Sequence, residues 1–158
     1  MHRKSIYMKL RIYLESSVIG GYYDIGYKAV TRQLFERIAC KEFEVYFSEL
    51  TDAELMSAPR QVKMVKKIIP PACFHYIKMN EDIWDLASLY IKEKAISESC
   101  RIDAYHIAFA SASGIDCLIS WNFKQIVNYD KIKIFKEINM RFGYPVIDFR
   151  SPLEFIKI

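Results

Sequence analysis

The 158-residue sequence predicts one α/β domain, built as a parallel sheet with helices on both faces. Short apolar runs alternate along the chain with longer amphipathic stretches, which is typical of β-α units. Several of the apolar runs are nearly continuous, as strands of a sheet covered on both faces require. Because 52% of the residues are hydrophobic, a chain of this length can bury one substantial core without disulfides. We therefore expect residues 1–158 to form a single domain.

Five apolar runs are predicted strands of the sheet. They are "LRIYLE" (10–15), "FEVYFS" (43–48), "ACFHYIK" (72–78), "DCLISW" (116–121) and "PVIDF" (145–149). Helical periodicity between them predicts helices at 28–41, at 51–69 with a break near Pro59, and at 80–95, 103–113 and 122–142. The last helix is expected to close at Gly143, since glycine readily ends a helix. The pair Gly20-Gly21 predicts a flexible loop after the first strand.

Composition excludes several classes of protein. The four cysteines lie far apart without a CxxC pair, so we expect reduced thiols in a cytoplasmic protein. Cys73 and His75 have no matching second pair, which argues against a zinc site. No apolar run approaches the roughly 20 residues that cross a bilayer, and the basic opening "MHRKSIYMKL" is too short for a targeting peptide. The formal charge of +4 mildly favours an anionic partner.

Four polar side chains are expected at one edge of the sheet. Glu15 ends the first strand, Glu54 lies in the first turn of the helix after the second strand, and Asn122 follows the fourth strand. Asp103 opens a helix that runs antiparallel to the strand it precedes, so its helix begins beside the carboxyl ends of the strands. Ligands of parallel α/β sheets bind at this edge.

Each of these residues also has a structural interpretation. Thr51-x-x-Glu54 matches a capping box, Asp103 complements a helix dipole, and Asn122 suits a turn or a helix cap. Glu15 has two structural alternatives, a salt bridge or exposure at the strand end. A charge at the end of an apolar strand is costly unless a cation or hydrogen-bond donors compensate it. Taken together, three carboxylates and one amide form an oxygen set that suits Mg²⁺ or Mn²⁺.

Four stretches of the chain resemble the signature regions of PIN-domain proteins. They are "IYLESSVIGGYYD", "SELTDAEL", "IDAYHIAFASASGIDCLISWNFKQIVN" and "VIDFRSPLEFI", of which the third, residues 102–128, is the most specific. PIN domains are metal-dependent ribonucleases with an α/β/α sandwich about a parallel sheet, and they include the VapC-like toxins of toxin-antitoxin systems. The resemblance implies such a fold here, with about five strands, a small antitoxin partner and a homodimer.

The same resemblance assigns roles to individual residues. Glu15, Glu54 and Asp103 match the family's first three acids, and Asn122 matches a position that is often a fourth acid. These four residues are then expected to hold the metal ion, with Ser17 and Ser120 orienting them. The family's first acid is usually Asp, so Glu15 carries an extra methylene. Two hypotheses follow, a Mg²⁺- or Mn²⁺-dependent endoribonuclease that hydrolyses RNA phosphodiester bonds, and a weakly active or inactive PIN-fold module that binds nucleic acid or protein.

Side chains around this edge are candidates for binding RNA. Basic residues are needed beside an acidic cleft, and the alternative for each is a solvated helix face. The candidates are Arg60, Lys63, Lys66, Lys67, Arg101 and Lys124, with Lys28 and Arg32 near other edge loops. Tyr22, Tyr23 and Tyr27 can stack on bases, pack over the domain or form a dimer surface. His106, one helical turn from Asp103, is placed to orient a ligand or the substrate, but a hydrogen-bonded core histidine is the favoured interpretation. A small-molecule α/β enzyme is less favoured, because no GxGxxG or Walker loop is present.

Overall fold

The computed structural model describes residues 8–156, so most of the basic opening segment lies outside the described residues. Five parallel strands form one sheet in the order β3-β2-β1-β4-β5. The strands are β1 (Leu10–Leu14), β2 (Phe43–Ser48), β3 (Phe74–Ile77), β4 (Cys117–Ile119) and β5 (Asp148–Arg150). The helices are α2 (Ser16–Gly21), α3 (Lys28–Ala39), α4 (Glu49–Met56), α5 (Arg60–Lys63), α6 (Glu81–Lys92), α7 (Arg101–Ala112) and α8 (Tyr129–Arg141). Short 3₁₀ segments are η1 (Met64–Ile68), η2 (Pro71–Cys73), η3 (Glu98–Cys100) and η4 (Pro152–Phe155).

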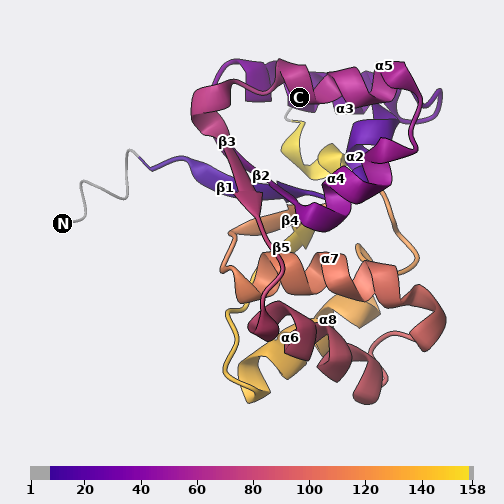
Figure 1. The fold of residues 1–158 in the computed structure, drawn as a ribbon, viewed down its shortest axis with the longest axis vertical. Coiled ribbons are helices and arrows are strands. Elements are labelled where there is room, and N and C mark those ends of the chain that lie inside the picture. The colour runs from indigo at the N-terminus through magenta and orange to yellow at the C-terminus, as the bar shows by residue number, and fades with distance from the viewer. Residues whose placement is uncertain (1–7, 157–158) are drawn as a thin grey trace.

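Alternating side chains of the strands enter two cores. Tyr13 packs with α6, α7 and α8 on one face of the sheet, whereas Ile12 and Leu14 pack with α2 and α3 on the other. Figure 1 shows the two helical layers, α2 to α5 on one side of the sheet and α6 to α8 on the other. All three of these strand residues are completely buried, which is why the runs contain so few polar residues. The α/β/α sandwich predicted from the sequence is confirmed.

The carboxyl ends of the three inner strands, β2, β1 and β4, lie beside the segments that carry the predicted site residues. Glu15 follows β1 directly, and its backbone N–H donates to the carbonyl of Ile119 at the end of β4 (3.1 Å). Helix α4 starts directly after β2, with Ser48 as its N-cap. Helix α7 precedes β4 and therefore begins at this same edge. The starts of α2, α4 and α7 are thus brought together.

The structure corrects two predictions about local structure. The expected loop at Gly20-Gly21 is the end of helix α2, for which Glu15 is the N-cap. The helix predicted from residue 122 begins only at Tyr129, because Asn122 Oδ1 accepts hydrogen bonds from the N–H groups of Lys124 and Gln125 and forms a turn. The break near Pro59 is confirmed, since Pro59 is the residue before α5. Gly143 has φ of 80° after α8, which is the left-handed conformation expected at its end.

Two further findings concern the described part of the chain as a whole. None of its helices is both long and apolar enough to cross a membrane. The four cysteines all lie within it and are free thiols.

Gly21 is expected to tolerate no side chain. A Cβ built there would lie 2.8 Å from Trp121 Nε1 and 2.9 Å from Thr31 Oγ1, two groups that are hydrogen-bonded to each other. We expect Gly21→Ala to lower the free energy of unfolding by about 1–3 kcal/mol through overpacking, as measured by urea denaturation. Gly20→Ala is the matched control, because nothing lies within 4 Å of a Cβ at Gly20. Equal stability of the two variants would contradict this close packing.

Candidate metal centre

Glu15 is buried at the edge of the sheet and surrounded by hydrogen-bond donors. Only 7% of the surface of Glu15 is exposed to solvent. One carboxylate oxygen, Oε1, accepts from Ser17 Oγ and Ser120 Oγ, both at 2.6 Å, and Oε2 accepts from the Ser17 N–H at 3.1 Å. Among residues 8–156 Glu15 forms no salt bridge, so both structural alternatives, an ion pair and simple exposure, are wrong. Donors alone compensate its charge.

The two serines are themselves fixed by backbone groups of the segment after β4. Ser17 Oγ accepts from the Trp121 N–H and Ser120 Oγ accepts from the Asn122 N–H, each at 2.9 Å. Because each oxygen already accepts from a backbone amide, its own proton is available for Glu15. The Glu15 carboxylate is therefore held from both α2 and β4.

Glu54 does not cap the helix that carries it. Ser48 caps α4 by accepting from the Thr51 N–H at 3.2 Å, so the predicted capping box is wrong. The Glu54 carboxylate instead accepts hydrogen bonds through Oε1 from Ser16 Oγ and from His106 Nε2, the latter at 2.7 Å. Burial acts to raise the pKa of Glu54, but the hydrogen bond and charge of His106, together with Ser16, outweigh it and lower the pKa. Glu54 is thus held as a carboxylate.

His106 was expected in the core, and its contact with Glu54 is the part that sequence reasoning missed. The side chain is fully buried, and its Nδ1 lies 2.7 Å from the hydroxyl of Tyr13. The sequence contained one signal for this contact. His106 lies one helical turn after Asp103, which places the two side chains next to each other on α7.

Asp103 and Asn122 form a pair beside these groups. Asp103 lies in the first turn of α7, and Asn122 Nδ2 donates to its Oδ1 at 3.2 Å. Burial raises the pKa of Asp103, and the negative charges of Glu15 and Glu54 raise it further, whereas His106 and Asn122 act in the opposite direction. Asp103 is therefore close enough to the other two acids for their charges to repel its own.

The residues present fit a divalent cation. Ligand atoms of Glu15, Glu54 and His106 lie within 4.8 Å of one another. Within residues 8–156, Glu54 Oε2 and Asp103 Oδ2 accept no hydrogen bond, and Glu15 Oε2 accepts one. Each carboxylate thus keeps lone pairs free, and repulsion between carboxylates is what a bound cation relieves. His106 Nε2 is not such a donor atom here, because it must carry a proton to bond the carboxylate.

Solved structures support the expected fold. No family model matches the sequence, and no curated protein sequence does so either. FitAcB from Neisseria gonorrhoeae superimposes with a TM-score of 0.56 at 13% identity, over 90% of this chain and 98% of the other. VapBC2 from Rickettsia felis, bound to a fragment of its promoter DNA, gives 0.54 at 17% identity, over 89% and 98%. Both are toxin–antitoxin complexes whose toxins are PIN-domain proteins.

This chain has the PIN-domain fold. A third structure, FitAB bound to an IR36 DNA fragment, agrees with a TM-score of 0.53 at 13% identity, over 89% of this chain and 94% of that chain. At such identities the likeness concerns the fold, and the roles of side chains rest on the geometry given above.

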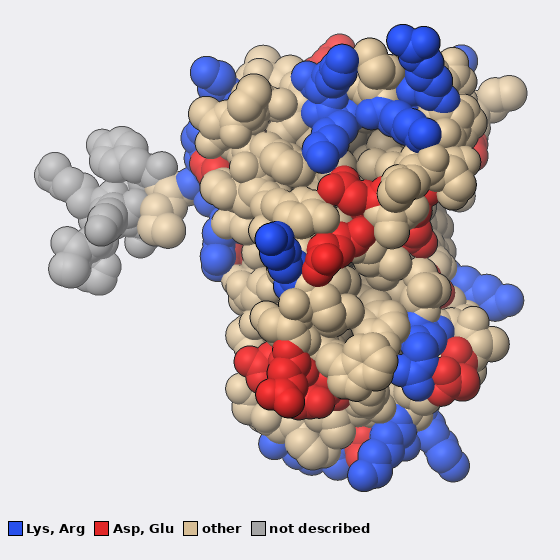
Figure 2. Space-filling model, viewed as in Figure 1, with Lys and Arg blue, Asp and Glu red and all other residues tan. Residues whose placement is uncertain are grey.

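Basic side chains border the PIN-fold site unevenly. Figure 2 shows Lys and Arg side chains gathered at the top of one face, above a group of acidic side chains. Lys66 is 3.4 Å from Asp52, and Arg101 forms two hydrogen bonds to Glu98, of 2.5 and 2.8 Å. Both of these basic side chains are thus paired with acidic residues of the protein itself. Five of the other predicted candidates are exposed, namely Lys28, Arg60, Lys63, Lys67 and Lys124.

The tyrosines after Gly21 mainly pack over the domain. Tyr27 stacks on Trp121 with 4.2 Å between ring centroids, and Tyr22 packs edge-on against Phe35. Tyr23 is 38% exposed and lies beneath the guanidinium of Arg32. The packing alternative thus accounts for two of the three tyrosines.

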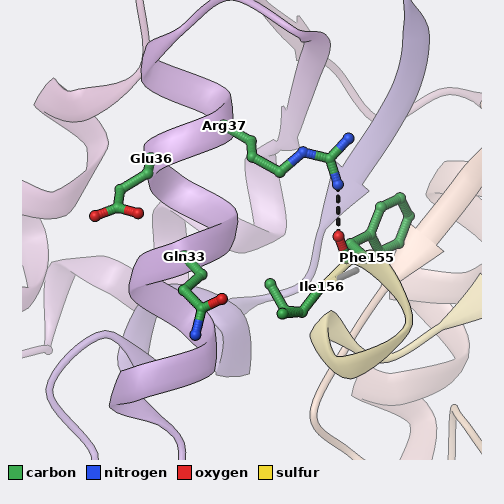
Figure 3. Close-up of a pocket in the computed structure, with 5 residues that line it drawn as sticks. All are labelled: Gln33, Glu36, Arg37, Phe155 and Ile156. Carbon is green, nitrogen blue, oxygen red and sulfur yellow. Dashed lines mark hydrogen bonds between the residues drawn. The ribbon is translucent and has the colours of Figure 1, made fainter. Parts of the chain in front are cut away.

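A surface cavity of the PIN fold lies apart from the carboxylates. It has a volume of about 390 Å³ and lies between α3 and η4 (Figure 3). Arg37 extends across it and donates to the carbonyl of Phe155 at 2.5 Å. The remaining lining residues are Gln33, Glu36 and Ile156, so it contains none of the residues predicted for the metal centre.

Proposed function

We propose that this chain is a divalent-metal-dependent endoribonuclease that hydrolyses RNA phosphodiester bonds and serves as the toxin of a toxin–antitoxin pair. The observation that carries the proposal is the meeting of Glu15 and Glu54 at the carboxyl edge of a PIN-fold sheet, with carboxylate oxygens of these two residues and of Asp103 that accept no more than one hydrogen bond within residues 8–156. The rise in the pKa of Asp103, caused by burial and then by the other two acids, supports it. Oxygen donors of this kind suit Mg²⁺ or Mn²⁺.

Each residue of the centre has a separate task in this mechanism. Bound Mg²⁺ or Mn²⁺ supplies activation of water and stabilisation of the charge that develops on the phosphate. Glu15, Glu54 and Asp103 hold the ion. Asn122 orients Asp103 through its Nδ2, because both lone pairs of its Oδ1 are used by backbone N–H groups. Ser17 and Ser120 fix Glu15, as the short bonds to its Oε1 support.

Exposed cations are proposed to bind the phosphates that flank the cleaved bond. An acidic centre repels RNA, so the polyanion has to be held by positive charge nearby. Lys63 and Lys67, in α5 and η1, are exposed, as is Lys124, two residues after Asn122. Lys66 and Arg101 contribute less in this proposal, because Asp52 and Glu98 already neutralise them.

A protein partner belongs to the same proposal. The solved structures with this fold are named as VapBC2, FitAcB and FitAB assemblies, two of them bound to DNA. We propose by analogy a small antitoxin partner for this chain, and a homodimer in a cytoplasmic setting.

Metal removal tests the enzymatic part of the proposal. We expect purified protein to cleave single-stranded RNA in the presence of Mn²⁺ or Mg²⁺ and to lose cleavage in EDTA, with recovery when excess Mn²⁺ is added. Mn²⁺ is also expected to raise Tm, because binding to the folded state alone stabilises it. Glu36→Gln, in the distant cavity of Figure 3, is the matched control and should behave as the wild type.

The alternative function gives a different result in the same assay. A PIN-fold binding module would bind RNA with equal affinity in EDTA and in Mn²⁺, and would not cleave it in either. That outcome would replace the nuclease with the binding module. The longer side chain of Glu15 is the feature that favours this alternative.

A further inference from the structure

A chain of buried polar groups crosses the centre of the domain and ends at Glu54. Tyr13, Ser48, Thr51 and His106 are all fully buried. The Tyr13 hydroxyl lies 2.7 Å from Ser48 Oγ and 2.7 Å from His106 Nδ1, and His106 Nε2 lies 2.7 Å from Glu54 Oε1. Within residues 8–156, Glu54 is the one member of this chain with a substantially exposed side chain, at 34%.

The Glu54 carboxylate, at the end of this chain of polar groups, determines that His106 Nε2 carries a proton. An ionised carboxylate only accepts hydrogen bonds, so His106 Nε2 donates to Glu54 in either protonation state of the ring. A nitrogen that carries this proton has no lone pair for a metal ion. His106 therefore acts on the ion only through Glu54.

Both ends of the polar chain reach the same helix. Ser48 is the N-cap of α4 and Glu54 lies one and a half turns later, while Tyr13 belongs to β1 and His106 to α7. The hydrogen bonds thus tie α4 to β1, which Glu15 directly follows, and to α7, which carries Asp103. Burying this many polar groups in an apolar core brings a desolvation cost that well-packed apolar side chains would avoid.

We propose that His106, held by the Tyr13 hydroxyl, is a positioning residue that fixes the Glu54 carboxylate for the metal ion. This inference rests on the proposed function, because it assigns a task to Glu54 as a ligand. The bond to Oε1 sets the plane of the carboxylate and leaves Oε2 for the ion. Groups that orient metal ligands in this way commonly change metal affinity by about 10- to 100-fold when removed.

Tyr13→Phe tests the inference with the smallest possible change. It removes one hydroxyl and keeps the ring. The matched control is Tyr90→Phe, since the Tyr90 hydroxyl is also fully buried and donates to the side chain of Asn139 at 2.5 Å, away from the carboxylates. We expect both variants to lose a similar few degrees of Tm, about 2–6 °C. Only Tyr13→Phe should weaken Mn²⁺ binding, by about 10-fold in calorimetry.

Two substitutions of His106 separate positioning from packing. His106→Gln places an amide donor near the position of Nε2, whereas His106→Leu fills the space without a donor. We expect His106→Gln to retain much of the Mn²⁺ affinity and of the cleavage rate, and His106→Leu to lose both by about 10-fold or more. Equal losses in the two variants would indicate a packing role and overturn the inference.

The calorimetry separates failure of this inference from failure of the proposed function. If Mn²⁺ binds the wild type and Tyr13→Phe equally strongly, only the positioning role is overturned. If the protein never cleaves RNA, but Mn²⁺ binding weakens in Tyr13→Phe and not in Tyr90→Phe, the positioning role is supported and the nuclease function is overturned. Absence of Mn²⁺ binding in the wild type overturns both.

Discussion

Asp103→Asn is expected to abolish metal-dependent cleavage and, in EDTA, to make the protein more stable at neutral pH than the wild type. The loss of cleavage should exceed about 100-fold, because a ligand is removed from the ion that activates water. The gain in stability follows from the environment of Asp103, where burial and the charges of Glu15 and Glu54 raise the pKa of the carboxyl group. The asparagine keeps the shape of the side chain and carries no charge.

The sign of the pH dependence follows from proton linkage. A carboxyl group whose folded-state pKa is raised binds more protons in the folded than in the unfolded state, so its contribution to stability falls as pH rises. That fall begins near the unfolded value of 3.8 and is complete above the raised folded-state pKa. The difference in Tm between Asp103→Asn and the wild type should therefore be small at acid pH and larger at pH 7.

Thermal denaturation from pH 3 to pH 8 measures this difference. Mn²⁺ should reverse the ranking at pH 7, because the ion neutralises the carboxylates of the wild type and binds the variant poorly. The control is Glu36→Gln, which removes a carboxylate that lines the separate cavity and is expected to leave cleavage unchanged. A variant less stable than the wild type in EDTA at pH 7 would show that the three carboxylates do not repel one another as described.

The five strands and the edge that carries the acids could be predicted because each depends on local patterns. Near-continuous apolar runs identify strands buried on both faces, and residues such as Ile12 and Tyr13 confirm this by entering opposite cores. Once the sheet is parallel, its topology brings residues as distant as Glu15 and Asp103 to the same edge. Residues that are far apart in the sequence can then be predicted to lie at the same site.

Helix α2 was outside the reach of local patterns, whereas the turn at Asn122 was one of the interpretations that the sequence offered. Gly20 and Gly21 have low helix propensity, and α2 is helical because Glu15 caps it and Gly21 packs against Trp121. At Asn122 the side chain competes successfully for two backbone N–H groups, which delays the start of α8. The outcome at α2 depends on the contact of Gly21 with Trp121, which is distant in the sequence.

The partner of Glu54 was missed for a related reason. Thr51-x-x-Glu54 matches a capping box in sequence, but Thr51 is already the third residue of α4, and Ser48, directly before the helix, caps it. Glu54 is then free to reach His106 and Ser16, which come from α7 and α2. A local motif predicted the wrong partner because tertiary contacts offered stronger donors.

Glu15→Asp is expected to weaken the metal centre, although Asp is the residue that the resemblance to PIN domains leads one to expect at this position. The shorter side chain withdraws the carboxylate by about 1.5 Å, one carbon–carbon bond. Ser17 Oγ and Ser120 Oγ both lie 2.6 Å from Glu15 Oε1, and each is itself anchored to a backbone N–H, so neither can follow the carboxylate. We expect Mn²⁺ affinity and cleavage to fall by about 10-fold or more.

A second substitution at the same position separates length from charge. Glu15→Gln keeps the length of the side chain and removes its charge, so it should lose Mn²⁺ binding for a different reason, while Glu15→Asp keeps the charge at a displaced position. Calorimetry with Mn²⁺ and RNA cleavage are measured on both. If Glu15→Asp cleaves faster than the wild type, the extra methylene impairs the centre, and the serine contacts hold Glu15 in a position the ion does not favour. If it cleaves more slowly, as the anchored serines predict, the pocket is built around glutamate, because the hydroxyls of Ser17 and Ser120 define where the carboxylate must end.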